Sequence, residues 1–280
     1  MAKSLLYMNT KKQYNLIGGG FNHYDNGNKS SSIYKQESKF IEWVNSGSDE
    51  TFYVDEHINF GFDDTESKKK YAWLLESKEI KPHIIEDIKR NYLHYVRVYD
   101  AIFTHNQELI NLHPKFKFSP LYGSWIPEPN LYDKSKLVSM ICSNKAMCTG
   151  HQHRLSWANK LQGKVDFYGR GFNEIGDKEE GLADYMFSVA IENASYKTYF
   201  TEKIQDCFST GTIPIYYGSP DIGEFFNLEG IILLTDDFDI SLLTPELYYD
   251  KLEAVKDNLE RVKNYLINED YIYNTYLQKL

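Results

Sequence analysis

The sequence predicts an α/β fold made of two successive domains with a ligand-binding cleft between them. Three observations support this fold class. Short apolar segments alternate with amphipathic ones along the chain, which is typical of strands and helices packed in layers. In the second half the apolar segments are mostly continuous, as in a parallel sheet that is covered on both faces. The length of 280 residues accommodates about two domains of roughly 150 residues each.

The first predicted domain covers residues 1–134. Residues 71–75 and 101–103 are short apolar runs, and each predicts a buried strand. Between them, apolar side chains recur at helical spacing from Ile84 to Tyr95, which predicts an amphipathic helix. Several prolines then mark a loop-rich stretch, and we place the domain boundary at its end, near residue 134.

The second predicted domain covers residues 135–280 and has a more regular pattern. A helix is expected from about His151 to Leu161, and the segment from about Pro245 onward predicts one long amphipathic helix. Five apolar runs predict strands, at residues 137–141, 165–168, 186–191, 212–217 and 231–234. A strand–loop–helix–strand unit of this kind places its loop at the carboxyl edge of the sheet, where ligands of open α/β folds bind.

Composition and charge disfavour several classes of protein. The 31 basic and 40 acidic residues give a net charge of −9, which does not indicate a general nucleic-acid-binding surface. No apolar run reaches the about 18 to 20 residues of a membrane helix, and no secretory signal is indicated because the N-terminus turns polar by Asn9. Cys142, Cys148 and Cys207 form no CxxC pair, which favours a reducing compartment. We therefore expect a soluble, cytoplasmic protein.

The densest functional signal lies between residues 187 and 203. A buried strand ends in a polar loop, and Thr201 is the predicted N-cap of the helix that follows. Helix N-termini favour anions, and Lys203 adds a positive charge suited to a phosphate. The carboxylate of Glu202 only accepts hydrogen bonds, which suits a pair of ribose hydroxyls. The residues alone leave open an alternative in which Glu202 complements the helix dipole and Lys203 is a solvated surface residue.

The same segment resembles the signature of the α-1,3-fucosyltransferase family, glycosyltransferase family 10. The resemblance is strongest over residues 185–227. It departs from the usual pattern where Ala194 replaces a serine and where Thr198 stands in place of an aspartate. The matching motifs are Glu192-Asn193-Ala194, Tyr199-Phe200-Thr201-Glu202-Lys203, Gly211-Thr212-Ile213-Pro214-Ile215 and Tyr217-Gly218-Ser219-Pro220.

This resemblance implies a GT-B type fold, in which two Rossmann-like domains face each other across a cleft. Residues 1–134 would form the acceptor-side domain and residues 135–280 the nucleotide-sugar-binding domain. The family implies transfer of a sugar, fucose or a relative, from a GDP-sugar to a hydroxyl of a glycan or glycolipid precursor, with inversion. It implies no cofactor and no required metal.

The resemblance also assigns roles to residues of the second domain. Asn193, Tyr199, Glu202 and Lys203 fall on nucleotide-sugar-binding positions of the family. Arg154 lies on the predicted helix after the first strand of the domain, where family members carry an arginine. A guanidinium there can hold two oxygens of the departing diphosphate at once. The alternative is that Arg154 is an ordinary surface residue of a helix.

Inverting transfer needs a base that takes the proton from the acceptor hydroxyl. Glu76 directly follows the predicted strand 71–75, and in the family a glutamate followed by serine or asparagine lies at the corresponding strand end. Here Ser77 fits that pattern, whereas Lys78 stands where many members have proline. Glu76 is therefore the predicted base, with Glu56 and Glu79 as fallback candidates. An alternative is that Glu76 only caps the following loop or helix.

The sequence is also compatible with other functions, to different degrees. A non-catalytic carbohydrate-binding protein with the same fold, or a transferase for another nucleotide sugar, remains an alternative. A dinucleotide-dependent oxidoreductase is disfavoured because Gly18-Gly19-Gly20 lacks the GxGxxG fingerprint. A metal site is not predicted, because His151 and His153 lack the i, i+4 spacing that puts two imidazoles on one helix face. The oligomeric state is not determined by the sequence.

Overall fold

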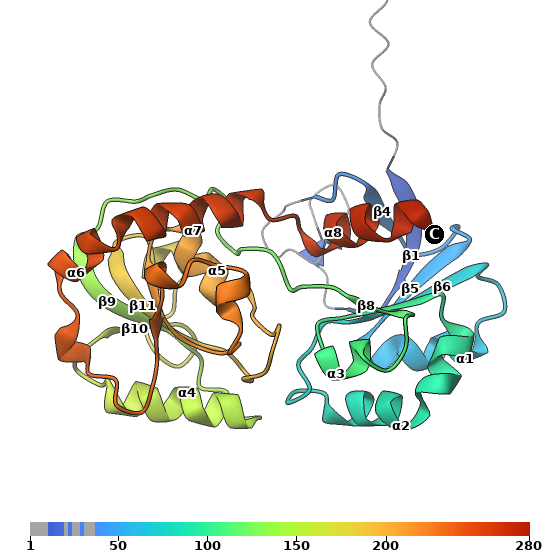
Figure 1. Cartoon of the computed structure of the whole chain (residues 1–280), viewed down its shortest axis with the longest axis horizontal. Coiled ribbons are helices and arrows are strands. Elements are labelled where there is room, and N and C mark those ends of the chain that lie inside the picture. The colour runs from blue at the N-terminus through green and yellow to red at the C-terminus, as the bar shows by residue number, and fades with distance from the viewer. Residues whose placement is uncertain (1–10, 20–21, 24–28, 31–36) are drawn as a thin grey trace, which may run out of the picture.

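The computed structural model describes residues 11–19, 22–23, 29–30 and 37–280. Figure 1 shows two lobes, each built around a sheet with helices on its outside. Apart from a two-stranded antiparallel ribbon, formed by β2 (Asn22–His23) and β3 (Lys29–Ser30), every strand pair is parallel in the described residues. The predicted α/β class is confirmed. Gly20 of the triple-glycine turn lies outside the described residues.

The first sheet has six strands in the described part of the chain, in the order β4-β1-β5-β6-β7-β8. The predicted strands 71–75 and 101–103 are confirmed as β6 and β7, whereas β4, β5 and β8 were not predicted. A charged residue interrupts the short apolar runs of β4 and β8, whereas β5 contains the continuous run Phe52-Tyr53-Val54. The strands are β1 (Lys12–Ile17), β4 (Ile41–Val44), β5 (Glu50–Val54), β6 (Lys69–Leu74), β7 (Ala101–Thr104) and β8 (Phe116–Phe118).

The second sheet confirms all five predicted strands, which lie in the order β10-β9-β11-β12-β13. Every residue of the central strand is buried. Phe187 and Val189 face one apolar core, and Ala190 faces another on the opposite side of the sheet. Continuous burial therefore explains the continuous apolar runs. The strands are β9 (Lys136–Ile141), β10 (Asp166–Tyr168), β11 (Tyr185–Ile191), β12 (Ile213–Tyr217) and β13 (Ile232–Leu233).

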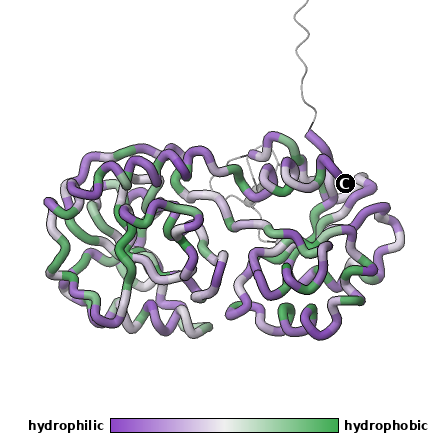
Figure 2. Tube along the Cα trace, viewed as in Figure 1, coloured by the Kyte–Doolittle hydropathy of each residue, from purple (hydrophilic) through white to green (hydrophobic). Residues whose placement is uncertain are grey.

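Helices cover both sheets, and Figure 2 shows hydrophobic residues along the strands with hydrophilic residues on the outer helices. The predicted helices around residues 84–95 and 151–161 are confirmed as α2 and α4. The α-helices are α1 (Phe60–Asp63), α2 (Pro82–Val98), α3 (Gln107–Ile110), α4 (Thr149–Lys160), α5 (Glu202–Ser209), α6 (Pro245–Asp250), α7 (Leu252–Asn264) and α8 (Asn268–Thr275). The short 3-10 helices are η1 (Asp55–Asn59), η2 (Lys178–Gly181), η3 (Ile222–Glu224), η4 (Leu228–Gly230), η5 (Ile240–Leu242) and η6 (Leu277–Lys279).

The prediction of one long helix from Pro245 onward is wrong, because this segment forms α6, α7 and α8. Extended backbone at Tyr265 and Ile267 ends α7 and precedes α8. In Figure 1 the chain crosses between the lobes after α7, so that α8 lies in the lobe of the first sheet, beside β4. There Ile272 and Leu277 join the apolar core of the first sheet. The last helix thus packs in the first lobe, while the boundary near residue 134 stays a prediction.

Polar contacts fix α8 in this place. The carboxylate of Asp270 accepts hydrogen bonds from the Ser38 hydroxyl at 2.5 Å and from the Lys39 amide at 3.0 Å. The indole of Trp43 on β4 donates to the buried Glu269 at 3.3 Å. Since these partners lie more than 200 residues apart in sequence, the chain closes on itself through its C-terminal helix. Of the helices in the described ranges, none combines the length and apolar composition that a bilayer span requires.

The carboxyl edges of the two sheets meet. His105 directly follows β7, and its ring packs against Tyr196 and Tyr199, which lie in the loop after β11. The Thr198 hydroxyl donates to the backbone carbonyl of His105 at 2.6 Å. The contact therefore brings the strand ends that bear Glu76 and the densest motif to one side of the molecule.

Candidate functional site

A cavity of about 330 Å³ lies at the carboxyl edge of the second sheet. This volume falls within the range of small-molecule sites in proteins. Its walls come from the ends of β9, β10 and β11, from α4 and α5, and from Trp125 in the connection between the lobes. Among the described residues, its charged walls hold five cations and two carboxylates, a formal surplus of three positive charges: Lys145, Arg154, Arg170, Lys178 and Lys203 against Glu202 and Asp206.

The N-terminus of α5 forms one wall of this cavity. Thr201 is its N-cap, as predicted, and its hydroxyl accepts from the Lys203 amide. The fully buried Glu192, at the end of β11, accepts from the Thr201 amide at 2.8 Å and from its hydroxyl at 2.7 Å. The ammonium of Lys203 lies 3.4 Å from Glu192 and 2.9 Å from the Thr201 hydroxyl. Glu192 thus ties the strand, the helix start and Lys203 together.

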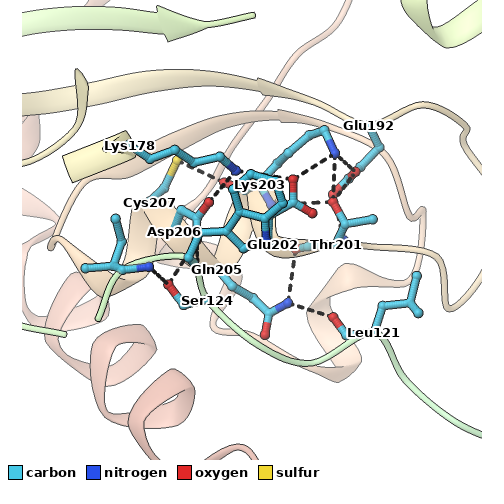
Figure 3. A network of polar contacts seen from close by, with 12 residues as sticks. Leu121, Ser124, Lys178, Glu192, Thr201, Glu202, Lys203, Gln205, Asp206 and Cys207 are labelled. Carbon is cyan, nitrogen blue, oxygen red and sulfur yellow. Dashed lines mark hydrogen bonds and ion pairs between the residues drawn. The ribbon is translucent and has the colours of Figure 1, made fainter. Parts of the chain in front are cut away.

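Four charged side chains form a connected network beside the cavity (Figure 3). The ammonium of Lys178 lies 2.6 Å from the Asp206 carboxylate and 3.2 Å from Glu202 Oε1. Lys203 approaches the same Oε1 atom at 3.3 Å. Because both lysines contact one oxygen of Glu202, they hold its carboxylate in a defined orientation at the cavity wall.

The shifts in pKa within this network follow from burial and charge. Burial favours the neutral form of each lysine, but attraction from Asp206 and Glu202 raises the pKa of Lys178, and attraction from Glu202 and Glu192 raises that of Lys203. Burial opposes ionisation of Glu202, yet the two lysines lower its pKa. Burial raises the pKa of Asp206, which lies deeper. The network keeps its lysines charged at the cavity wall.

The connection between the lobes is docked onto α5 through the same network. Asp206 accepts from the Ser124 hydroxyl at 2.9 Å and from the Trp125 amide at 2.5 Å. Gln205 donates to the Leu121 carbonyl at 2.9 Å (Figure 3). The Lys178 ammonium lies 3.9 Å from the centre of the Trp125 ring. The connection is therefore part of the wall rather than a free linker.

Arg154 reaches the cavity from α4. It is 6% exposed, and its Nη1 donates to the Ile191 carbonyl at 3.4 Å. Its buried Nε has no hydrogen-bond partner in the described part of the chain. His151 lines the cavity one turn earlier, and burial together with Arg154 and neighbouring lysines lowers its pKa. A buried guanidinium with an unused donor is suited to an anionic ligand.

The structure brings together four of the six predicted site residues. Arg154, Asn193, Glu202 and Lys203 line the cavity. Tyr199 is only 2% exposed and instead stacks on Tyr196, with ring centres 4.8 Å apart. Glu76 is exposed at the end of β6 and does not line the cavity. The roles assigned to these residues stay predictions.

Tyr199 nevertheless contacts the turn that follows β6, at Ser77. Burial and the charge of Glu192 raise the pKa of Tyr199, whereas a hydrogen bond with the Ser77 side chain lowers it. Lys78, in the same turn, lies over the Tyr196 ring at 4.9 Å. The turn after β6 therefore rests against the loop that leads into α5.

The fallback bases and His153 do not line this cavity. Glu56 on η1 forms an ion pair with Lys81, and Glu79 is exposed in the turn before α2. The His153 ring accepts from the Trp157 indole at 3.2 Å and packs on Tyr217. Within the described ranges, no three or more histidine, cysteine or acidic side chains are grouped so as to hold a metal.

Sequence reasoning missed Lys178, Asp206, Glu192 and Trp125. One signal was available, because Asp206 lies four residues after Glu202 on the same face of α5. Like charges at this spacing repel, so a nearby cation was implied. Nothing in the sequence pointed to Lys178 as that cation, since it lies 28 residues away from Asp206 in the connection before β11.

A sequence profile described as glycosyltransferase family 10 (fucosyltransferase) C-term matches residues 131–276. The chain belongs to glycosyltransferase family 10. It is 34% identical over 106 residues to alpha-(1,3)-fucosyltransferase FucT of Helicobacter pylori, covering 37% of this chain and 22% of that enzyme. It is 33% identical over 84 residues to alpha-(1,3)-fucosyltransferase B of Drosophila melanogaster, covering 30% and 18%. The matched segment thus spans about a fifth of these relatives.

Two solved structures described as alpha1,3-fucosyltransferases share the fold. A crystal structure of an alpha1,3-fucosyltransferase superposes with a TM-score of 0.54 at 18% identity, over 93% of this chain and 83% of that one. A second, described as the enzyme with GDP, gives 0.53 at 15% identity, over 99% and 91%. The predicted GT-B fold with two parallel-sheet domains is confirmed.

Proposed function

We propose that this family 10 protein is an inverting glycosyltransferase that uses GDP-fucose or a close relative as donor. The observation that carries the proposal is the cation-rich cavity beside the start of α5, in a chain whose net charge is −9. A diphosphate is the kind of ligand that such a surplus of positive charge favours. Similar proteins named as fucosyltransferases, one of them solved with GDP, support the choice of nucleotide.

In the proposed complex, Arg154 and Lys203 bind the diphosphate, and Glu202 accepts hydrogen bonds from the ribose. Asn193 contributes to the same pocket from the end of β11. Tyr199 is assigned to its border, where it supports the loop between Asn193 and α5. As the bond between the anomeric carbon and the diphosphate oxygen breaks, its electron pair leaves with GDP. The two cations stabilise the charge that develops there.

The acceptor is proposed to be a hydroxyl of a glycan or glycolipid precursor bound at the first lobe. Its oxygen attacks the anomeric carbon from the side opposite the diphosphate, which inverts the configuration. The hydroxyl proton passes to the carboxylate of Glu76. We assign no cofactor or metal to this step. We also propose a cytoplasmic location, supported by the three free, buried cysteines and tested by cell fractionation.

Calorimetric titration with GDP, UDP, ADP and CMP, without added metal, tests the nucleotide assignment. We expect GDP to bind most tightly and Lys203→Ala to weaken it about 10- to 100-fold, because a charge-assisted hydrogen bond contributes about 1.5 to 3 kcal/mol. Arg154→Ala is the second variant, since loss of Lys203 leaves Glu192 without its cation. Lys256→Ala, on the outer face of α7, is the matched control.

Each outcome separates the remaining functions. Preference for another nucleotide would keep a transferase and replace the donor. Binding of a carbohydrate without any nucleotide dependence would indicate a non-catalytic carbohydrate-binding protein. If no nucleotide binds, the transferase proposal is contradicted.

A further inference from the structure

Asp55 occupies an unusual position next to the turn that carries Glu76. It directly follows β5, which pairs with β6 in the first sheet. Its Oδ1 atom accepts from the backbone amide of Leu75 at 2.9 Å and from that of Glu76 at 3.2 Å. A single carboxylate oxygen thus holds two successive amides at the point where β6 ends.

The backbone of Asp55 is strained. Among the described residues, Asp55 and Thr198 are the two non-glycine residues with positive φ, at 48° and 65°. Such a conformation costs about 1 to 3 kcal/mol and persists where the surroundings impose it, often at functional sites. The Asp55 carboxylate accepts from the backbone amides of the turn after β6. Thr198 lies in the loop that packs against the same turn. Asp55 therefore adjoins the predicted base, and the loop of Thr198 contacts the turn after it.

Pairing with a cation does not explain the position of the Asp55 carboxylate. Burial, together with the neighbouring Glu76 and Glu56, raises the pKa of its carboxyl to about 6, although the two amide hydrogen bonds lower it. The nearby cation, Lys81, is paired with Glu56. Among the described residues, Glu56, Glu76 and Lys81 are charged groups that interact with it. Burial therefore disfavours the ionised form of Asp55, yet its carboxylate accepts hydrogen bonds from the two amides.

We propose that Asp55 is a positioning residue whose carboxylate fixes the direction in which the Glu76 side chain leaves the end of β6. This inference rests on the proposed transferase function and deepens its base assignment. Two fixed amides define the backbone of Leu75 and Glu76, and hence the direction of the Cα–Cβ bond of Glu76. A base misplaced by about 1 Å can cost about 100-fold in rate.

The test compares Asp55→Gly with Asp55→Asn. Glycine suits the positive φ but removes the acceptor, whereas asparagine suits the same φ and keeps an acceptor oxygen. Turnover is measured as GDP release from GDP-fucose, with N-acetyllactosamine or water as acceptor. We expect Asp55→Gly to lower kcat about 10- to 100-fold with little change in donor KM, and Asp55→Asn to lose clearly less. Asp63→Ala, an exposed aspartate at the end of α1, is the matched control.

A double-mutant cycle shows whether Asp55 acts through Glu76. In a Glu76→Gln background, Asp55→Gly should add less than about a twofold loss, because the group that it positions is gone. Unchanged kcat in Asp55→Gly, or an equal loss in both backgrounds, would overturn the inference. A wild-type protein that releases no GDP would contradict the proposed function instead.

Hydrogen exchange provides a readout that does not depend on turnover. In Asp55→Gly, the amides of Leu75 and Glu76 should exchange faster than in the wild type, and in Asp55→Asn they should stay protected. Unchanged exchange in Asp55→Gly would overturn the inference, because it would mean that Asp55 does not hold these two amides in the wild type.

Discussion

The carboxyl edges of the two sheets are built alike but carry opposite charge. At the second sheet, the strand ends and the start of α5 gather a surplus of cations around a cavity. At the first sheet, the strand ends of β5 and β6 bear Asp55, Glu56 and Glu76. Parallel sheets expose loops at this edge in both lobes, so the architecture alone does not distinguish them. The side chains on the loops decide which reactant each lobe can hold.

The two edges also differ in how their charges are satisfied. Lys178 and Lys203 at the second sheet are each paired with buried carboxylates, which keep them charged and in place. Glu76 at the first sheet is exposed, and its backbone is held through Asp55. A paired, rigid set of cations suits a bound anion, whereas an exposed carboxylate is accessible to a hydroxyl. Substitutions at Glu76, Asp55 and Gly150 separate these two roles.

The largest effect is expected from Glu76→Gln. Loss of a general base typically lowers the rate about 10²- to 10⁴-fold, so kcat should fall by this range while GDP affinity is unchanged. Steady-state turnover and GDP titration of the same preparation measure the two quantities. Glu86→Gln, an exposed position on α2, is the control. Normal turnover of Glu76→Gln would remove the base assignment and direct attention to Glu56 and Glu79.

A pH-dependent effect is expected at Asp55. Since its pKa is raised to about 6, the native state keeps this proton up to that pH, whereas the unfolded chain releases it near pH 4. Stability contributed by this group is therefore lost as the pH rises from about 4 to 6. Relative to Asp55→Asn, the wild type should lose about 2 kcal/mol of unfolding free energy between pH 4 and pH 7. Urea denaturation of both proteins at the two pH values checks this, and a pH-independent difference would contradict it.

A smaller effect on the second edge is expected from Gly150→Ala. Gly150 lies in the first turn of α4, and a Cβ there would overlap the backbone carbonyl of Asn193. The helix must then move away from the end of β11, which should destabilise the fold by about 1 to 2 kcal/mol and lower GDP affinity about tenfold. Gly176→Ala is the control, because its nearest neighbour is the end of the Glu180 side chain at 3.3 Å. Unchanged GDP affinity in Gly150→Ala would show that α4 does not shape the donor site.

The accuracy of the sequence predictions differed between the lobes for a physical reason. Strands of the second sheet, such as β11, are buried on both faces and leave continuous apolar runs. β4 and β8 lie at the edges of the first sheet, and a charged residue interrupts the apolar run of each, so their patterns are weak. The break between α7 and α8 was missed because both segments are amphipathic and no proline or glycine separates them.

By itself, the sequence determined the α/β class, the strands of the second sheet, the N-cap at Thr201 and membership of the family signature. These are local properties, since each depends on residues within one strand, loop or helix. Tertiary structure alone decided that Lys178 pairs with Asp206, that α8 packs on the first sheet, and that Asp55 holds the turn of Glu76. Each of these contacts joins residues distant along the chain, and their pairing depends on how the sheets and connections pack.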